Sequence, residues 1–319
     1  MDPASIDDLR VIVDDQSRLA LGLILVGMMF TVALGLRVED FRRVAEQPVR
    51  VLGGVMAQIV GLPLLTLGLI LILSPPASVA LGMLVVASCP GGNVSNVLTQ
   101  LARGNAAWSV SLTAISSVSA AVVTPVSIMF WASVYGPTAA LVDRLDVDPL
   151  PFIVQTIVVL TVPLAAGMMV AHHFPRLAQR MRRVLAPCAL AAIFVLIIVG
   201  LVQNWPVVLA AGSVVIPIVV LHNAAAFGFG NLAGHALRLD APRRRATTFE
   251  VGIQNSGLGL LILLSQFDGL GGAAAIVGLW SIWHLVGGTA LVGLFRALDW
   301  LRLPKTALAQ DTSRRSPHA

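Results

Sequence analysis

Two stretches of the sequence place hydroxyls and amides beside glycine and proline within apolar surroundings. The first is SCPGGNVSNVLTQLARGN, at residues 88–105, and the second is RRRATTFEVGIQNSGLGLLILL, at residues 243–264. Glycine and proline loosen a helix and free backbone carbonyls and amides. Hard cations such as Na⁺ prefer oxygen ligands, which these carbonyls and the hydroxyl and amide side chains supply. The N-terminus of a half-helix, with its free N–H groups, favours an anion. The residue types therefore favour a site for ions or polar solutes.

One carboxylate lies inside an apolar segment. Among the sixteen Asp and Glu residues, only Glu250 falls within a predicted span, beside the second interruption. A charged side chain within a bilayer costs several kcal/mol, so it usually faces a cavity or a partner. We interpret Glu250 as a cation or proton site, and a structural carboxyl bonded to neighbouring amides remains the alternative. Close packing of small residues would explain the glycines but neither the amides nor Glu250.

The composition of the chain indicates a membrane protein. The chain has 319 residues, of which 57% are hydrophobic and 12% charged, and its mean hydropathy is +0.87. A soluble domain has about 25% charged residues, so the class predicted is an all-α polytopic membrane protein. Nine transmembrane helices are expected, the third and the eighth of them interrupted: about 19–36, 51–73, 78–102, 106–134, 151–172, 186–202, 207–236, 246–267 and 271–295.

The distribution of basic residues supports nine spans. With this count, 18 of the 21 Lys and Arg residues fall on one side of the membrane and 3 on the other. Because basic loops stay in the cytoplasm, we predict a protein of the cell membrane with its N-terminus outside and its C-terminus inside. The high pI then reflects topology, so no nucleic-acid partner is expected.

Residues 1–18 are acidic and do not read as a signal peptide. Cys89 and Cys188 suggest neither a disulfide nor a metal cluster.

The spans also show internal symmetry. An uninterrupted span, an interrupted span and another uninterrupted span follow one another at about 51–134 and again at 207–295. The two blocks start on opposite sides of the membrane, so they are predicted to be inverted repeats. Paired interruptions in corresponding positions of two halves point to the binding site of a transporter.

Several motifs resemble the bile acid:sodium symporter family. They are Cys89-Pro90-Gly91-Gly92, Ser95-Asn96, Leu101-Ala102-Arg103-Gly104-Asn105, Leu221-His222-Asn223 and the run from Glu250 to Gly257. The resemblance implies two crossing broken helices, a core domain (about 51–134 and 207–295) and a panel domain (about 19–36 and 151–202). The transporter domain would span 19–295, between a polar segment at 1–18 and a basic cytoplasmic tail at 296–319. Many family members have ten spans, and the usual first helix has no counterpart here.

The same resemblance implies two Na⁺ ions. The first would be bound by Ser95, Asn96, Ser109, Thr113 and Glu250, and the second by Gln58, Glu250, Val251, Ile253 and Gln254. Ser109 and Thr113 are four residues apart, so they share a helix face. Val251 and Ile253 could bind a cation only through their backbone carbonyls.

The resemblance also implies a small organic anion as substrate, contacted by Asn255 and His284. Leu285 stands where bile-acid carriers have an asparagine, so the expectation is an organic anion, with a carboxylate favoured, rather than bile acid itself. The predicted activity is secondary active, sodium-coupled symport by alternating access. A proton-coupled carrier and an arsenite-type exporter using Cys89 remain alternatives. No enzymatic motif appears, and the sequence does not indicate an oligomeric state.

Overall fold

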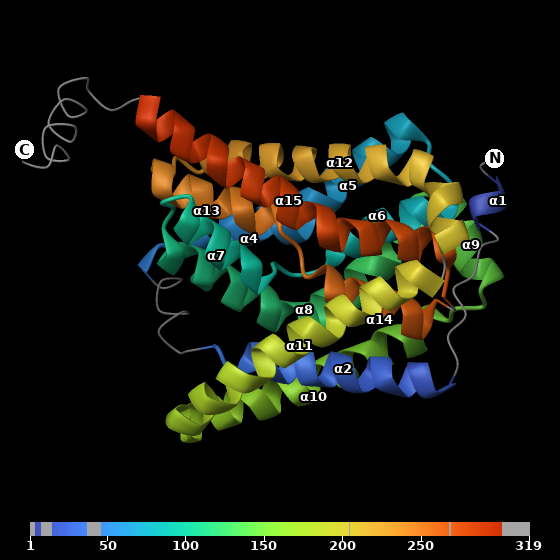
Figure 1. Cartoon of the computed structure of the whole chain (residues 1–319), viewed down its shortest axis with the longest axis horizontal. Coiled ribbons are helices and arrows are strands. Elements are labelled where there is room, and N and C mark those ends of the chain that lie inside the picture. Colours follow the sequence, from blue (N-terminus) through green and yellow to red (C-terminus); the bar gives the residue numbers. More distant parts are fainter. Residues whose placement is uncertain (1–3, 8–14, 37–45, 204, 268, 302–319) are drawn as a thin grey trace, which may run out of the picture.

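A computed structural model describes residues 4–7, 15–36, 46–203, 205–267 and 269–301, and within these ranges the regular elements are helices (Figure 1). They are α1 (Ala4–Asp7), α2 (Asp15–Ala33), α4 (Pro48–Met56), the π-helical turn η1 (Ala57–Gly61), α5 (Leu62–Leu73), α6 (Ala77–Ser88), α7 (Asn93–Leu101), α8 (Ala106–Val134), α9 (Gly136–Arg144), α10 (Pro149–His173), α11 (Pro175–Gln203), α12 (Trp205–Ala236), α13 (Ala241–Gly252), α14 (Ser256–Gln266) and α15 (Gly271–Leu301).

Several of these helices are long and apolar enough to cross a membrane. Within the described residues, five meet that condition: Pro48–Leu73, Ala106–Val134, Pro149–His173, Gly212–Ala236 and Gly271–Leu301. Three shorter helices are also apolar: Leu19–Ala33, Ala77–Ser88 and Ser256–Gln266. The prediction of an all-helical polytopic membrane protein is confirmed. Each of the nine predicted segments coincides with a helix or a pair of half-helices, and the number of crossings stays a prediction.

Some helices extend beyond the predicted spans. Helix α11 begins at Pro175 rather than near 186, and α15 continues to Leu301, so the first residues of the predicted tail are helical. Helix α9 occupies part of a predicted loop. Hydropathy detects apolar residues, whereas a helix continues through a polar stretch wherever its backbone bonds are kept. In the predicted N-terminal segment, residues 4–7 form α1 and α2 begins at Asp15; residues 302–319 lie outside the described part.

Both predicted interruptions are present, and they contact each other. Helix α6 ends at Ser88 and α7 begins at Asn93, while α13 ends at Gly252 and α14 begins at Ser256. Across the junction, the Gly92 N–H donates to the Ile253 carbonyl at 3.0 Å, and the Asn255 N–H donates to the Pro90 carbonyl at 2.8 Å. Each break therefore satisfies backbone groups that the other leaves free, as a membrane interior requires.

Side-chain caps mark where several helices begin. The Asn255 side chain accepts from the Leu258 N–H at the start of α14, and Asn105 does the same for Trp108 in α8. Asp240 accepts from the Arg243 N–H at the start of α13. Asn and Asp are favoured caps because their oxygens bond the unpaired N–H groups of the first turn.

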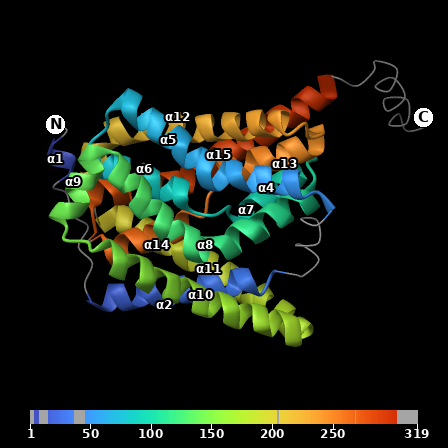
Figure 2. The ribbon, with the colours of Figure 1, turned by 180° about the vertical axis from the view of Figure 1, so that it is seen from behind.

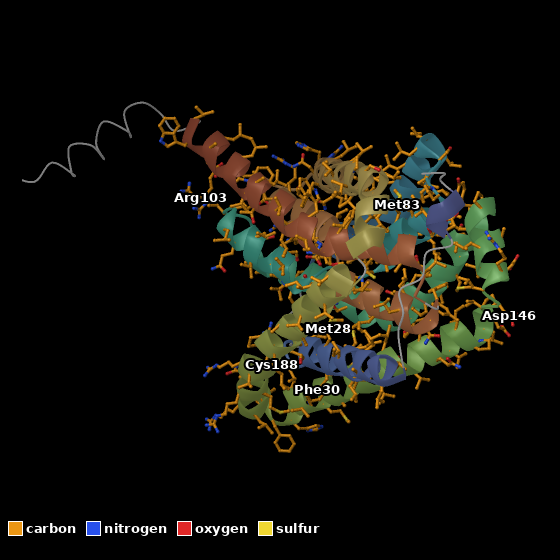
Figure 3. All side chains as sticks on the ribbon, turned by 45° about the vertical axis from the view of Figure 1, so that its right-hand side comes forward. Met28, Phe30, Met83, Arg103, Asp146 and Cys188 are labelled. Carbon is orange, nitrogen blue, oxygen red and sulfur yellow. The ribbon has the colours of Figure 1, made fainter. Side chains whose placement is uncertain are left out.

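The packing of the helices places three of them at one edge of the molecule and one of them in its interior. Helices α2, α10 and α11 contact one another and lie along one edge of the molecule (Figures 1 and 2). Helix α6, buried along its whole length, packs against α8, α14 and α15 in the interior. Arg103 at the end of α7 and Asp146 after α9 lie at opposite ends of the molecule (Figure 3).

Candidate functional site

Three hydroxyl groups surround one oxygen of the buried carboxylate. Glu250 on α13 is 1% exposed. Its Oε2 accepts from Ser95 of α7 at 2.7 Å, from Thr113 of α8 at 2.9 Å and from Ser109 of α8 at 3.4 Å. The helical spacing of Ser109 and Thr113 presents both to the same carboxylate. Residues far apart in the sequence thus form one cluster of oxygen atoms.

The other carboxylate oxygen has no partner. Within the described residues, Glu250 Oε1 is buried and makes no hydrogen bond, and the same holds for Gln58 Oε1. Gly91 lies between these side chains. A Cβ at residue 91 would overlap Glu250 Oε1 and would lie 3.1 Å from Gln58 Nε2. The missing side chain at residue 91 therefore lets the Glu250 carboxylate lie against the backbone of the first break, and a cation bound there would satisfy its buried Oε1.

A second group of predicted residues lies next to the first. Gln58 Nε2 donates to Gln254 Oε1 at 3.2 Å, and Gln254 Nε2 donates to the Val251 carbonyl at 2.7 Å. Gln58 belongs to the π-helical turn η1, a deviation that occurs often at functional sites. The carbonyl of Ile253 accepts from the Gly92 N–H, which uses only one of its two lone pairs.

The structure brings the remaining predicted ligand into the same cluster and adds one residue. Asn96 Oδ1 lies 3.4 Å from the hydroxyl oxygen of Thr113. Thr99, which the sequence analysis missed, is fully buried and donates to Ser109 Oγ at 3.3 Å. Its position four residues after Ser95, on the same face of α7, was the signal that could have identified it.

A cavity of about 610 Å³ borders the junction. Met28 and Thr31 of α2 and Pro187 of α11 line one side of it, and Figure 3 labels Met28 on α2 and Cys188 on α11. The opposite side comes from the starts of α7 and α14 and from α15, including Asn93, Asn255, Ser256, Ser281, His284 and Leu285. The two predicted substrate residues, Asn255 and His284, therefore line one cavity. Two half-helix N-termini also border it, and such termini favour anions.

Cys89 lies away from this cavity. Its thiol is buried, donates to the Val85 carbonyl at 3.2 Å and lies 3.1 Å from the position of a Cβ on Gly259. The thiol thus packs between α6 and α14 and does not line the cavity. Within the described residues, no cluster of three His, Cys, Asp or Glu side chains could hold a metal ion.

Broken apolar helices that meet beside a buried carboxylate and a cavity define a membrane transporter. The model of the Sodium Bile acid symporter family matches residues 20–211. The chain is 34% identical over 271 residues to the sodium-dependent transporter YocS of Bacillus subtilis, covering 85% of this chain and 80% of that protein. The chain therefore belongs to the sodium bile acid symporter family.

Two other relatives are more distant. The probable sodium/metabolite cotransporter BASS1 of Arabidopsis thaliana is 31% identical over 276 residues, which cover 86% of this chain and 65% of that protein. The human ileal sodium/bile acid cotransporter is 25% identical over 247 residues, which cover 77% and 69% of the two chains. These relatives are transporters, and each of them is named for sodium-dependent transport or cotransport.

Proposed function

We propose that this protein is a secondary active transporter that couples the entry of Na⁺ to the uptake of an organic anion, with a carboxylate favoured. The observation that carries the proposal is the unsatisfied Glu250 Oε1, buried against Gly91 at the junction of the two breaks. A buried oxygen without a partner is costly, and a bound cation would remove that cost.

Two Na⁺ positions follow from the two groups of oxygens. The first is bounded by Ser95, Asn96, Ser109, Thr113 and Glu250, and the second by Gln58, Glu250, Gln254 and the carbonyls of Val251 and Ile253. One carboxylate shared by two monovalent cations leaves a net positive charge. That charge and the half-helix N-termini of α7 and α14 would attract an anion to the cavity.

Alternating access is the mechanism that fits the position of the cavity. The cavity lies between α2 and α11 on one side and α7, α14 and α15 on the other. If the predicted panel (19–36 and 151–202) and core (51–134 and 207–295) move relative to each other, the cavity would open to alternate sides of the membrane. Ions that bind the substrate-ready state more tightly would couple the two fluxes.

We assign the protein to the cell membrane with the N-terminus outside, following the distribution of basic residues. The inverted repeats correspond to α4–α8 and α12–α15.

A carrier that uses a proton at Glu250 is the competing function, and it shares the same carboxylate. An exporter that uses a thiol is disfavoured because Cys89 does not line the cavity.

Uptake into proteoliposomes tests the proposal. A sodium gradient should drive accumulation of a carboxylate tracer, and a potassium gradient should not. Glu250→Gln keeps the side-chain shape but removes the charge, so it should abolish sodium-dependent uptake. Asp143→Asn, at an exposed position of α9, is the matched control and should transport normally. Uptake driven equally by a proton gradient without sodium would establish the proton carrier instead.

A further inference from the structure

A second groove lies between α12 and α15, and it shares no lining residue with the cavity at the breaks. Its volume is about 590 Å³, within the range of small-molecule sites. One face of α12 and one face of α15 line the groove, and Thr248 of α13 also lines it. The lining residues are Val220, Asn223, Ala224, Phe227, Gly228, Asn231, Thr248, Trp283, Gly287, Ala290, Leu291, Leu294 and Phe295.

The groove opens on an apolar surface. Ala224, Gly228 and Ala290 on its rim are exposed and small. Large apolar side chains beside it are exposed as well, including Leu221 and Val286. Both helices are long enough to cross a membrane. An occupant would therefore enter from the hydrocarbon of the bilayer rather than from water.

One buried polar atom of this groove lacks a partner. Asn223 is 1% exposed, and its Nδ2 donates to the carbonyl of Gly252, at the end of α13, at 2.8 Å. That bond fixes the orientation of the amide, because a carbonyl can only accept. Asn223 Oδ1 is then buried with no donor among the described residues.

A donor for which the described residues supply no acceptor, the indole N–H of Trp283, lies close to this oxygen. A Cβ on Gly287 would lie 2.9 Å from Asn223 Oδ1 and 3.7 Å from Trp283 Nε1. Both atoms therefore flank the same small space above Gly287. Asn223 Oδ1 needs a donor and the Trp283 indole N–H needs an acceptor, and a hydroxyl group supplies both. A hydrocarbon tail would leave both atoms unsatisfied.

We propose that this groove binds an apolar molecule that carries one hydroxyl group and is dissolved in the bilayer. The hydroxyl would lie between Asn223 and Trp283, and the hydrocarbon part would lie along the facing surfaces of α12 and α15. The proposal does not depend on sodium coupling, because it rests on the groove alone.

Photolabelling of the purified full-length protein in lipid nanodiscs tests the binding. The probe is a long-chain alcohol with a diazirine in its chain, and labelled residues are mapped by peptide mass spectrometry. Labelling should concentrate on α12 and α15. The unlabelled alcohol should compete at least tenfold better than its methyl ether, which accepts but cannot donate. A polycyclic alcohol run as a further competitor distinguishes a flat, rigid occupant from a linear one.

Two glycine variants provide the structural control. A Cβ on Gly228 or on Gly293 would meet no atom within 4 Å, so a side chain at either position would begin in open space. Gly228→Leu fills the groove and should reduce labelling at least fivefold, while Gly293→Leu, on α15 outside the groove, should leave it unchanged. Equal competition by the ether would mean that only lipid tails occupy the groove. Unchanged labelling in Gly228→Leu, or cross-linking of two copies through α12 and α15, would also overturn the proposal.

Discussion

Gly92 donates its backbone N–H to the carbonyl oxygen of Ile253 at 3.0 Å, which links the break between α6 and α7 to the break between α13 and α14. Gly91 and Gln254 face each other across the same junction. The two interruptions thus form one structural unit, and Glu250 lies three residues before Ile253. A change in the backbone at either break should therefore alter the other.

Gly91→Ala should disrupt the cation site. The added methyl would overlap Glu250 Oε1 and press on Gln58, and overpacking of this kind costs about 1–3 kcal/mol. We expect loss of the thermal stabilisation by sodium, measured as the unfolding temperature in sodium against potassium. Gly68→Ala is the control, because a Cβ there meets no atom within 4 Å. Full stabilisation by sodium in Gly91→Ala would contradict the proposed position of the ion.

Thr113→Val should weaken sodium binding. The hydroxyl donates to Glu250 Oε2 at 2.9 Å, and a hydrogen bond to a charged group contributes about 1.5–3 kcal/mol. A loss of about 10- to 100-fold in sodium affinity follows, measured by titrating the unfolding temperature with sodium. Thr289→Val makes the same change where the hydroxyl bonds only its own helix. An equal loss in both variants would show a general effect of the substitution.

Asn255→Asp should distinguish the role of Asn255 as the cap of α14 from its proposed role in binding the substrate. Asn255 Oδ1 accepts from the Leu258 N–H, and aspartate caps a helix as well as asparagine does. The variant should therefore fold normally, but its negative charge in the cavity should raise KM for an anion at least tenfold. Asn105→Asp makes the same change at the start of α8, away from the cavity, and should leave KM unchanged. An unaltered KM in Asn255→Asp would exclude anion binding there.

Arg245→Gln should lower the stability of the protein, because it removes contacts that join α13 to α15 and to the end of α7, near Arg103. Arg245 forms a two-bonded ion pair with Asp299 of α15 and also donates to the Ala102 carbonyl, at the end of α7, at 2.8 Å. We expect a loss of about 2–3 kcal/mol in stability, seen as a lower unfolding temperature. Arg144→Gln, at an exposed position, should have no effect. Arg245→Lys should recover only part of the loss, because lysine lacks the planar fork.

The ends of the helices show where sequence reasoning was limited. The two breaks were predictable because glycine, proline and amides interrupt apolar runs there. The start of α11 at Pro175 and the existence of α9 were not, since their polar residues carry no hydropathy signal. Thr99 was also missed, because a threonine in a helix more often bonds its own backbone than joins a site.

The sequence by itself determined the membrane class, the positions of both interruptions and the presence of one carboxylate among apolar residues. Each of these follows from residue types and their local spacing, which composition and periodicity report directly. Only the tertiary structure decided that Ser95, Ser109 and Thr113 meet at one oxygen of Glu250 while no described residue bonds the other, and that Asn223 and Trp283 flank a separate groove. Such contacts join residues more than a hundred positions apart, or depend on how helices cross, and no local pattern encodes them.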